Sequence, residues 1–187
     1  MPTRVISFLG VCFRLLRSVP KDFIFSFLFT PFTPVAILPF DPQTDRIANK
    51  LIRRIAKVSP TVSVHFFGSS SLKIAGRGDI DLIVTCPPSA MPAIQARITA
   101  NFGVPVRIEP TLIKWQFTQS SRSIEVVLTH PASREFIGQK RIFTLLKNDP
   151  AILRQYESTK LSFDHLSEWE YELRRKDFFN QVLISKL

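Results

Sequence analysis

Cysteine is nearly absent from this sequence, which has only Cys12 and Cys86 among its 187 residues. Two cysteines this far apart exclude a disulfide framework and a cysteine-based metal site, and they indicate a reducing, cytoplasmic location. Histidine is almost as scarce, and neither His65, His130 nor His165 has a partner at the spacing of zinc ligands. His65 and His130 could flank a cleft, but a hydrogen-bonded structural role is favoured for both.

Acidic residues are also few. Asp and Glu together number 15 against 25 Lys and Arg, which gives a formal charge of +10 and a pI near 10.1. Such a balance favours anionic partners, namely nucleotides, nucleic acid or an anionic membrane surface. The longest basic run is only Arg174-Arg175-Lys176, so a solvated basic surface is the alternative. The length and the 45% apolar content suffice for one compact domain.

A clean membrane-spanning stretch is lacking too, although the first residues are apolar. Residues 5–13 are too short and residues 23–40 contain three prolines, whereas a spanning helix needs about 20 mostly apolar residues. The small-residue cleavage site of a signal peptide is missing. We interpret residues 1–34 as a hydrophobic N-terminal extension with three readings. It is an anchor in weak contact with an anionic membrane, a flap packed on the domain, or an extension created by an upstream start codon.

The informative stretch is residues 67–82, where a Gly-Ser turn stands ahead of an Asp-x-Asp pair. Side chains two residues apart on a strand point to the same face, so Asp79 and Asp81 converge while Ile80 and Leu82 enter the core. Mg²⁺ is usually bound by one or two carboxylates together with the phosphates of a substrate. The pair therefore predicts a metal site with a phosphate beside it.

Gly68 and Ser69 are the candidates for holding that phosphate. They follow the apolar run 62–67, and a tight turn after a strand exposes backbone N–H groups that a phosphate can approach closely at glycine. A helical turn at residues 70–75 would add positive potential at its N-terminus. A turn glycine, a capping serine and a turn-capping Asp79 would look the same one by one, so the spacing of the whole set favours the site.

From residue 35 onward strand and helix signals alternate, which predicts an α/β (α+β) fold, a mixed sheet flanked by helices. Strands are expected at 35–38, 62–67, 79–85, 113–117 and 124–128. Helices are expected at 42–58, capped by Thr44 or Asp45, and at 89–101, capped by Ser89 and ended by Gly103. Three helices follow, at 133–147, 151–166 and 168–184. The expected division is the extension 1–34, a core 35–130 and a C-terminal helical segment 131–187.

The order of an apolar strand, Gly-Ser, nine residues and Asp-apolar-Asp resembles the signature of the DNA polymerase beta nucleotidyltransferase superfamily. From Val35 the chain also resembles the GrpB family of small nucleotidyltransferase-like proteins. The marks of that resemblance are residues 35–42, the Gly-Ser turn, the Asp strand, residues 148–150 with Tyr156 and Lys160, and then Tyr171, Arg175 and Phe178. The resemblance implies a nucleotidyltransferase-like core with a helical tail.

The resemblance further implies a catalytic and metal-binding trio, Asp79, Asp81 and Glu125, that holds two Mg²⁺ ions. Many GrpB members have one acidic residue before the strand, whereas this chain has the full pair, and Glu125 stands where active nucleotidyltransferases carry a third. The register leaves open whether Glu125 faces the cleft or lies exposed at a sheet edge, and the site role is favoured. The residues expected to hold a nucleoside triphosphate are Gly68, Ser69, Lys73, Arg77, Lys160 and Arg175.

We therefore expect metal-dependent transfer of a nucleotidyl group from a nucleoside triphosphate to an acceptor that the sequence does not identify, a small molecule, a protein or RNA. The first alternative is a catalytically inert nucleotide- or RNA-binding module of the same fold. The second is a membrane-associated regulatory protein that docks through residues 1–34.

Overall fold

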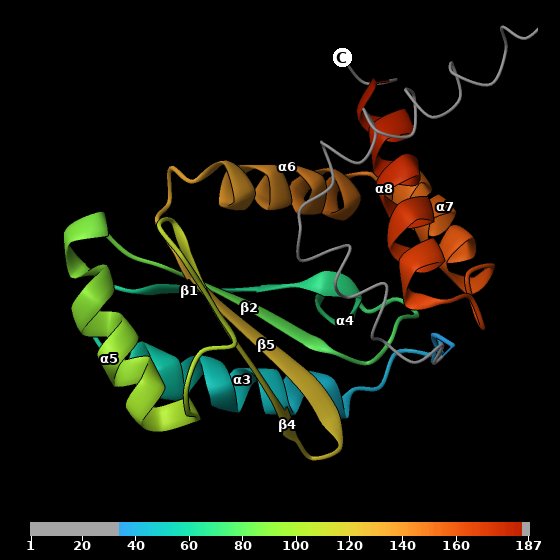
Figure 1. Cartoon of the computed structure of the whole chain (residues 1–187). Helices are drawn as coiled ribbons and strands as arrows, with labels where there is room; N and C mark the ends of the chain where they lie inside the picture. The colour runs from blue at the N-terminus through green and yellow to red at the C-terminus, as the bar shows by residue number, and fades with distance from the viewer. Residues whose placement is uncertain (1–33, 185–187) are drawn as a thin grey trace, which may run out of the picture.

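The computed structural model describes residues 34–184, which contain a five-stranded mixed sheet with helices on both faces (Figure 1). The strands lie in the order β1-β2-β5-β4-β3. Their bounds are Ser63–Phe67 for β1, Ile80–Thr85 for β2, Arg107–Glu109 for β3, Leu112–Gln119 for β4 and Arg122–Thr129 for β5. Strands β2 and β5 are parallel, and the other neighbours are antiparallel. The predicted mixed sheet with flanking helices and a C-terminal helical tail is confirmed.

One face of the sheet carries the main core, covered by α3 (Gln43–Ala56) and α5 (Met91–Phe102). Leu82, Trp115 and Val126 are fully buried there at 0% exposure. Because side chains alternate along a strand, the residues between them face the opposite side. A slip of one residue would exchange the two faces, so this core fixes the register of the central strands.

The opposite face is covered in part by α6 (Arg134–Asn148), which crosses it (Figure 1). Phe136 of this helix packs against Phe67 and Ile83. The helix begins after Ser133, whose side chain accepts a hydrogen bond from the backbone N–H of Phe136. The ends of β2 and β5 that face the C-terminal helices are left for polar side chains.

The last two helices, α7 (Pro150–Leu161) and α8 (Glu168–Ile184), pack together beside the short helix α4 (Gly68–Leu72) (Figure 1). Ile74 lies in one apolar cluster with Tyr156 and Phe178, so the loop after α4 is anchored on both helices. Helix α7 starts at Pro150 with Asp149 as its N-cap. The helical tail therefore stands directly beside the Gly-Ser turn.

Two strand predictions need correction. Residues 35–38 are not a strand of the sheet. They form only isolated bridges, because their backbone partners are Gly76 and the turn that joins α7 to α8. Strand β3 was not predicted, since it is only three residues long and mostly exposed, so it carries no buried alternation.

Several helix ends also differ from the predictions. Asp41, rather than Thr44 or Asp45, accepts from the first backbone N–H of α3. Ser89 does not cap α5, because it lies inside a 3₁₀ turn, Pro88–Ala90, that precedes the helix. Gly103 ends α5 as predicted, at a φ of +89°. Helix α7 stops at Leu161 rather than residue 166, and the turn after it brings His165 to a positive φ.

No helix within residues 34–184 is both long and apolar enough to cross a bilayer. The predicted hydrophobic extension falls almost entirely on residues 1–33, which lie outside the described part of the chain.

Candidate active site

The parallel pairing of β2 with β5 brings two of the predicted carboxylates together. Asp81 is in register with Glu125, and Phe67 at the end of β1 is in register with Asp81. Neighbours in register share a face, so both carboxylates lie on the face that α6 partly covers. Glu125 is therefore on a central strand, not at a sheet edge. Asp79 lies just before β2, two residues from Asp81.

The surroundings of Asp81 raise its pKa. Burial, with the negative charges of Asp79 and Glu125, raises the pKa of Asp81 to about 7. Within residues 34–184 its side chain has no hydrogen-bond donor and no ion-pair partner. The backbone of Gly68 lies against it so closely that a Cβ there would be 2.2 Å from Oδ2 of Asp81. Glycine at position 68 is thus required both by this contact and by its φ of +78°.

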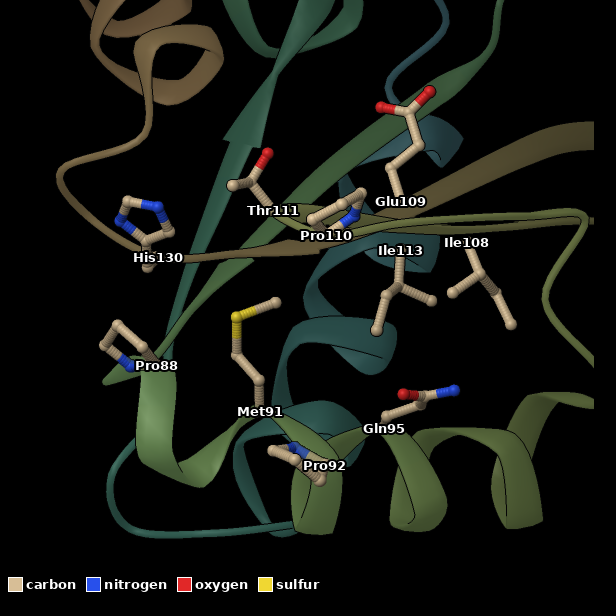
Figure 2. A pocket seen from close by; sticks show the side chains of 10 residues that line it. All are labelled: Pro88, Met91, Pro92, Gln95, Ile108, Glu109, Pro110, Thr111, Ile113 and His130. Atoms are coloured by element: carbon tan, nitrogen blue, oxygen red, sulfur yellow. The ribbon is translucent and has the colours of Figure 1, made fainter.

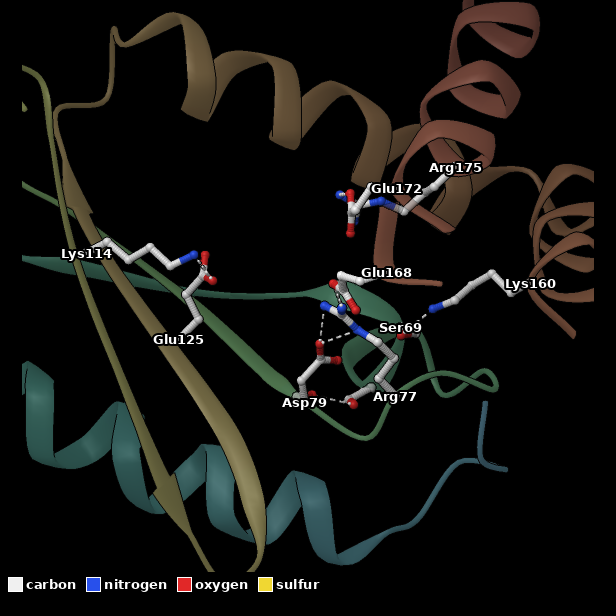
Figure 3. A network of polar contacts seen from close by, with 10 residues as sticks. Ser69, Arg77, Asp79, Lys114, Glu125, Lys160, Glu168, Glu172 and Arg175 are labelled. Carbon is white, nitrogen blue, oxygen red and sulfur yellow. Dashed lines mark hydrogen bonds and ion pairs between the residues drawn. The ribbon is translucent and has the colours of Figure 1, made fainter. Parts of the chain in front are cut away.

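Asp79 is held by Arg77. The Nε and Nη2 of Arg77 donate to Oδ2 of Asp79 at 3.1 and 2.8 Å, and its Nη1 donates to Glu168 at the start of α8 (Figure 3). Burial would lower the pKa of Arg77, but the charges of Asp79 and Glu168 outweigh it and raise the pKa. The guanidinium also lies 5.3 Å from the ring centre of Tyr171. One arginine therefore links the predicted metal carboxylate to the C-terminal helix.

Glu125 is paired as well, with a residue that the sequence reasoning missed. Its Oε2 lies 2.5 Å from Nζ of Lys114 on β4 (Figure 3). The only sequence signal was the alternation in β4, where Lys114 and Gln116 interrupt a run of apolar residues. Asp79 and Glu125 both lie close enough to raise the pKa of Asp81, but each is itself paired with a cation. Among the described residues, no group of three acidic, histidine or cysteine side chains is arranged to hold a metal ion.

The Gly-Ser turn is built as a strand end followed at once by α4, which starts at Gly68 rather than at residue 70. Oγ of Ser69 accepts a hydrogen bond of 2.7 Å from Nζ of Lys160, which comes from α7 and is only 2% exposed (Figure 3). Gly76 closes the contact, since a Cβ there would be 2.2 Å from Oγ of Ser69. Ser70 donates to the carbonyl of Asp79 at 2.8 Å, which ties the turn to the carboxylate loop.

Lys160 is a buried cation next to that turn. Burial, helped by the positive charges of Arg175 and Arg77, lowers the pKa of Lys160 to about 8, although Asp79 and Asp81 act in the opposite direction. Arg175 on α8 donates to Glu172 at 2.6 Å and is close enough to influence the pKa of both Asp81 and Lys160. These two residues, proposed from the C-terminal resemblance, therefore lie at the same site as the carboxylates.

Lys73 is the predicted residue that is not brought to this group. It is exposed at the C-terminal end of α4, at a φ of +58°. Within the described chain no contact joins its side chain to the carboxylates.

A separate hollow of about 380 Å³ lies at the other end of the sheet (Figure 2). It is lined mainly by apolar residues, among them Met91, Ile108 and Ile113, with His130 at its side. His130 follows the end of β5, whereas Asp81 lies near the beginning of β2 and Glu125 lies in the middle of β5. The hollow and the carboxylate group are therefore distinct places on the molecule.

No protein-family model and no curated protein matches this sequence, so the resemblance to the GrpB family stays a prediction. Among solved structures, the chain is similar to a Cid1 poly(U) polymerase with MgGTP bound, at a TM-score of 0.45 and 15% identity over 67% of this chain and 45% of that one. A second structure of Cid1, described for its RNA terminal uridylyl transferase activity, gives a TM-score of 0.40 and 15% identity, over 67% and 44%. The similarity thus spans less than half of either solved chain, and at this level it says nothing about the activity of this protein.

We expect Gly68→Ala to destabilise the protein by about 2 kcal/mol, because alanine at a positive φ is strained and its Cβ meets Asp81. Gly138→Ala in α6 is the matched control. Nothing lies within 4 Å of its new Cβ, so a gain of up to about 1 kcal/mol is expected. Denaturant unfolding of both variants measures the difference, and equal effects would contradict the close contact at Gly68.

Lys160→Met is expected to change how stability depends on pH. The pKa of Lys160 is 10.5 in the unfolded chain and about 8 in the folded protein. Below pH 8 the buried ammonium therefore destabilises the folded state fully. As pH rises from about 8 to about 10.5 the folded protein loses this proton first, and the parent protein becomes more stable. The free energy of unfolding of Lys160→Met relative to the parent should therefore drop by up to about 3 kcal/mol between pH 7 and pH 10. Lys50→Met, on the exposed side of α3, should give a flat difference. A flat difference for Lys160→Met would show that its ammonium is well hydrated.

Proposed function

We propose that this protein transfers a nucleotidyl group from a nucleoside triphosphate to an acceptor, with Mg²⁺ bound at Asp79 and Asp81. The observation that carries the proposal is the state of Asp81. It lies beside a second carboxylate on the neighbouring strand, has no cation partner within residues 34–184, and touches the Gly-Ser turn. Asp81 is only half-buried, so this unpaired carboxylate is accessible to a cation from solution.

The chemistry of the donor set fits a hard divalent cation. Carboxylate oxygens are the ligands that Mg²⁺ takes in proteins, commonly one or two of them together with substrate phosphates. Burial first, and then the charges of Asp79 and Glu125, raise the pKa of Asp81, and a bound cation would favour its charged form. Bound Mg²⁺ would neutralise negative charge on the triphosphate during transfer. Asp79 and Asp81 would hold it, and Arg77 keeps Asp79 oriented through two hydrogen bonds.

The cations around the Gly-Ser turn fit the triphosphate itself. Gly68 allows close approach of a phosphate to the backbone, and Lys160 reaches Ser69 from α7. A buried ammonium such as that of Lys160 is costly unless it pairs with an anion. This cost supports a phosphate as the partner of Lys160. Arg175 would add a second positive group from α8. Arg175 is paired with Glu172, one turn away on the same helix. This pair can form or break without any change of fold.

The acceptor is a small molecule, a protein or RNA, and Glu125 would lie on its side of the site. One specific observation favours the second candidate function, a module that binds nucleotide without turnover. Asp79 and Glu125 are each already neutralised by a cation of this chain, Arg77 and Lys114. An inert module predicts triphosphate binding that survives Asp81→Ala and releases no pyrophosphate.

The direct test of activity is Mg²⁺-dependent release of pyrophosphate from each of the four nucleoside triphosphates, with total RNA or small hydroxyl compounds as acceptors. Asp81→Asn should lower the rate at least about a thousandfold, equivalent to roughly 4 kcal/mol of transition-state stabilisation. Asp177→Asn, an exposed aspartate of α8, is the control and should keep the parent rate. Release that survives Asp81→Asn would place the chemistry elsewhere, and binding without any release would favour the inert module.

The two adjacent arginines of α8 give a matched pair for triphosphate binding. Arg175 lies among the site groups, whereas Arg174 is exposed on another side of the helix. Arg175→Met should weaken binding of ATP with Mg²⁺ about tenfold, since one charge-assisted contact to phosphate is lost, while Arg174→Met should change it less than about twofold. Titration calorimetry measures both constants. If both variants lost the same affinity for ATP, Arg175 would contribute only through the general positive charge of the protein.

A further inference from the structure

Lys114 lies on the same face of the sheet as the carboxylates, one strand beyond Glu125. It is in register with Val127, and Gln116 is in register with Glu125, so Lys114 reaches diagonally to the glutamate. The pair is half-buried, with side-chain exposures of 28% for Lys114 and 34% for Glu125, and Nζ lies 2.5 Å from Oε2. The ammonium of Lys114 therefore already neutralises the Glu125 carboxylate, which a second metal ion would need as a ligand.

The three acidic residues differ in how easily each could become a metal ligand. Asp81 has no partner to give up within the described chain. Asp79 is paired with Arg77, but Arg77 also holds Glu168, so it keeps a carboxylate partner when Asp79 turns to an ion. Lys114 has no ion-pair partner other than Glu125 among the residues that the structure describes. Freeing Glu125 would therefore leave a half-buried lysine with no counter-charge.

The ammonium of Lys114 and a divalent metal ion cannot both bind the carboxylate of Glu125, for an electrostatic reason. A divalent ion bound by its carboxylate would lie within a few ångströms of the ammonium, and two positive charges at that distance repel strongly in a partly desolvated site. The backbone of Lys114 is fixed by pairing with both β3 and β5, and turning its ammonium away would separate it from Glu125, its one ion-pair partner among the described residues.

We propose that Lys114 supplies the positive charge at Glu125, so that Asp79 and Asp81 bind a single divalent ion instead of the two that the resemblance implies. This inference rests on the proposed function, because it takes the carboxylate pair as the metal site. Lys114 is then a positioning residue that keeps Glu125 out of the metal's ligand set.

The test is titration of the full-length chain with Mn²⁺ alone, with bound metal counted by electron paramagnetic resonance. The parent protein should bind about one Mn²⁺. Lys114→Met frees Glu125 and should add a second bound ion, whereas Lys50→Met on α3 should match the parent. Two ions bound by the parent, or a Lys114→Met variant that binds no more than the parent, would overturn the inference.

A charge-balanced double variant tests the same inference without leaving an unpaired lysine. Glu125→Gln combined with Lys114→Met should keep one bound Mn²⁺ with its dissociation constant within about threefold of the parent, because Glu125 is not a ligand and the pair is removed together. A loss of more than about tenfold would make Glu125 a ligand and contradict the inference while leaving the metal site intact. If the parent binds no Mn²⁺ at all, the proposed function fails and this inference fails with it. Both failures can thus be told apart.

Discussion

The parallel pairing of β2 with β5 is the constraint on which the rest of the site depends. It sets Asp81 and Glu125 side by side, with Asp79 just before them, so like charges accumulate on one face of the sheet. Four basic side chains, each from a different part of the chain, lie around these carboxylates. Arg77 comes from the loop before β2, Lys114 from β4, Lys160 from α7 and Arg175 from α8. Of the three carboxylates, only Asp81 makes no ion pair within residues 34–184, although Arg77 and Arg175 lie near enough to lower its pKa, so a cation from solution is its natural partner.

The C-terminal helices are part of this site and not an appendage to the sheet. Lys160 contacts Ser69, and Glu168 holds Arg77, so α7 and α8 each reach one side of the carboxylate loop. The loop between α4 and β2 is anchored to them by Ile74 in the apolar cluster and by the bond from the Ala75 N–H to Glu157. Loss of the tail would therefore disturb both the phosphate turn and Asp79.

The sequence allowed prediction of the parts that depend on short spacings. Asp79 and Asp81 share a face because a strand alternates, and the mixed sheet follows from strand and helix signals along the chain. It did not reveal Lys114 as the partner of Glu125, because the register of the β4–β5 hairpin is set by the tight turn at Ser120 and Ser121, whose place within the polar run 118–123 the sequence alone did not fix. Nor could it assign residues 35–38, whose extended backbone pairs with Gly76 and the α7–α8 turn instead of the sheet. Lys160 was named for the site only through a family resemblance, and its contact with Ser69, 91 positions away in the chain, was not predicted.

The central claim is that Asp79 and Asp81 form the metal end of a triphosphate site. Its most direct test is a crystal of the protein grown with Mn²⁺ and a non-hydrolysable nucleoside triphosphate, measured for anomalous scattering of manganese. The account predicts a manganese peak at ligand distance from the carboxylates of both Asp79 and Asp81, with the triphosphate lying against Gly68 and Ser69. A triphosphate bound in the distant hollow beside His130, or manganese bound away from both carboxylates, would contradict it.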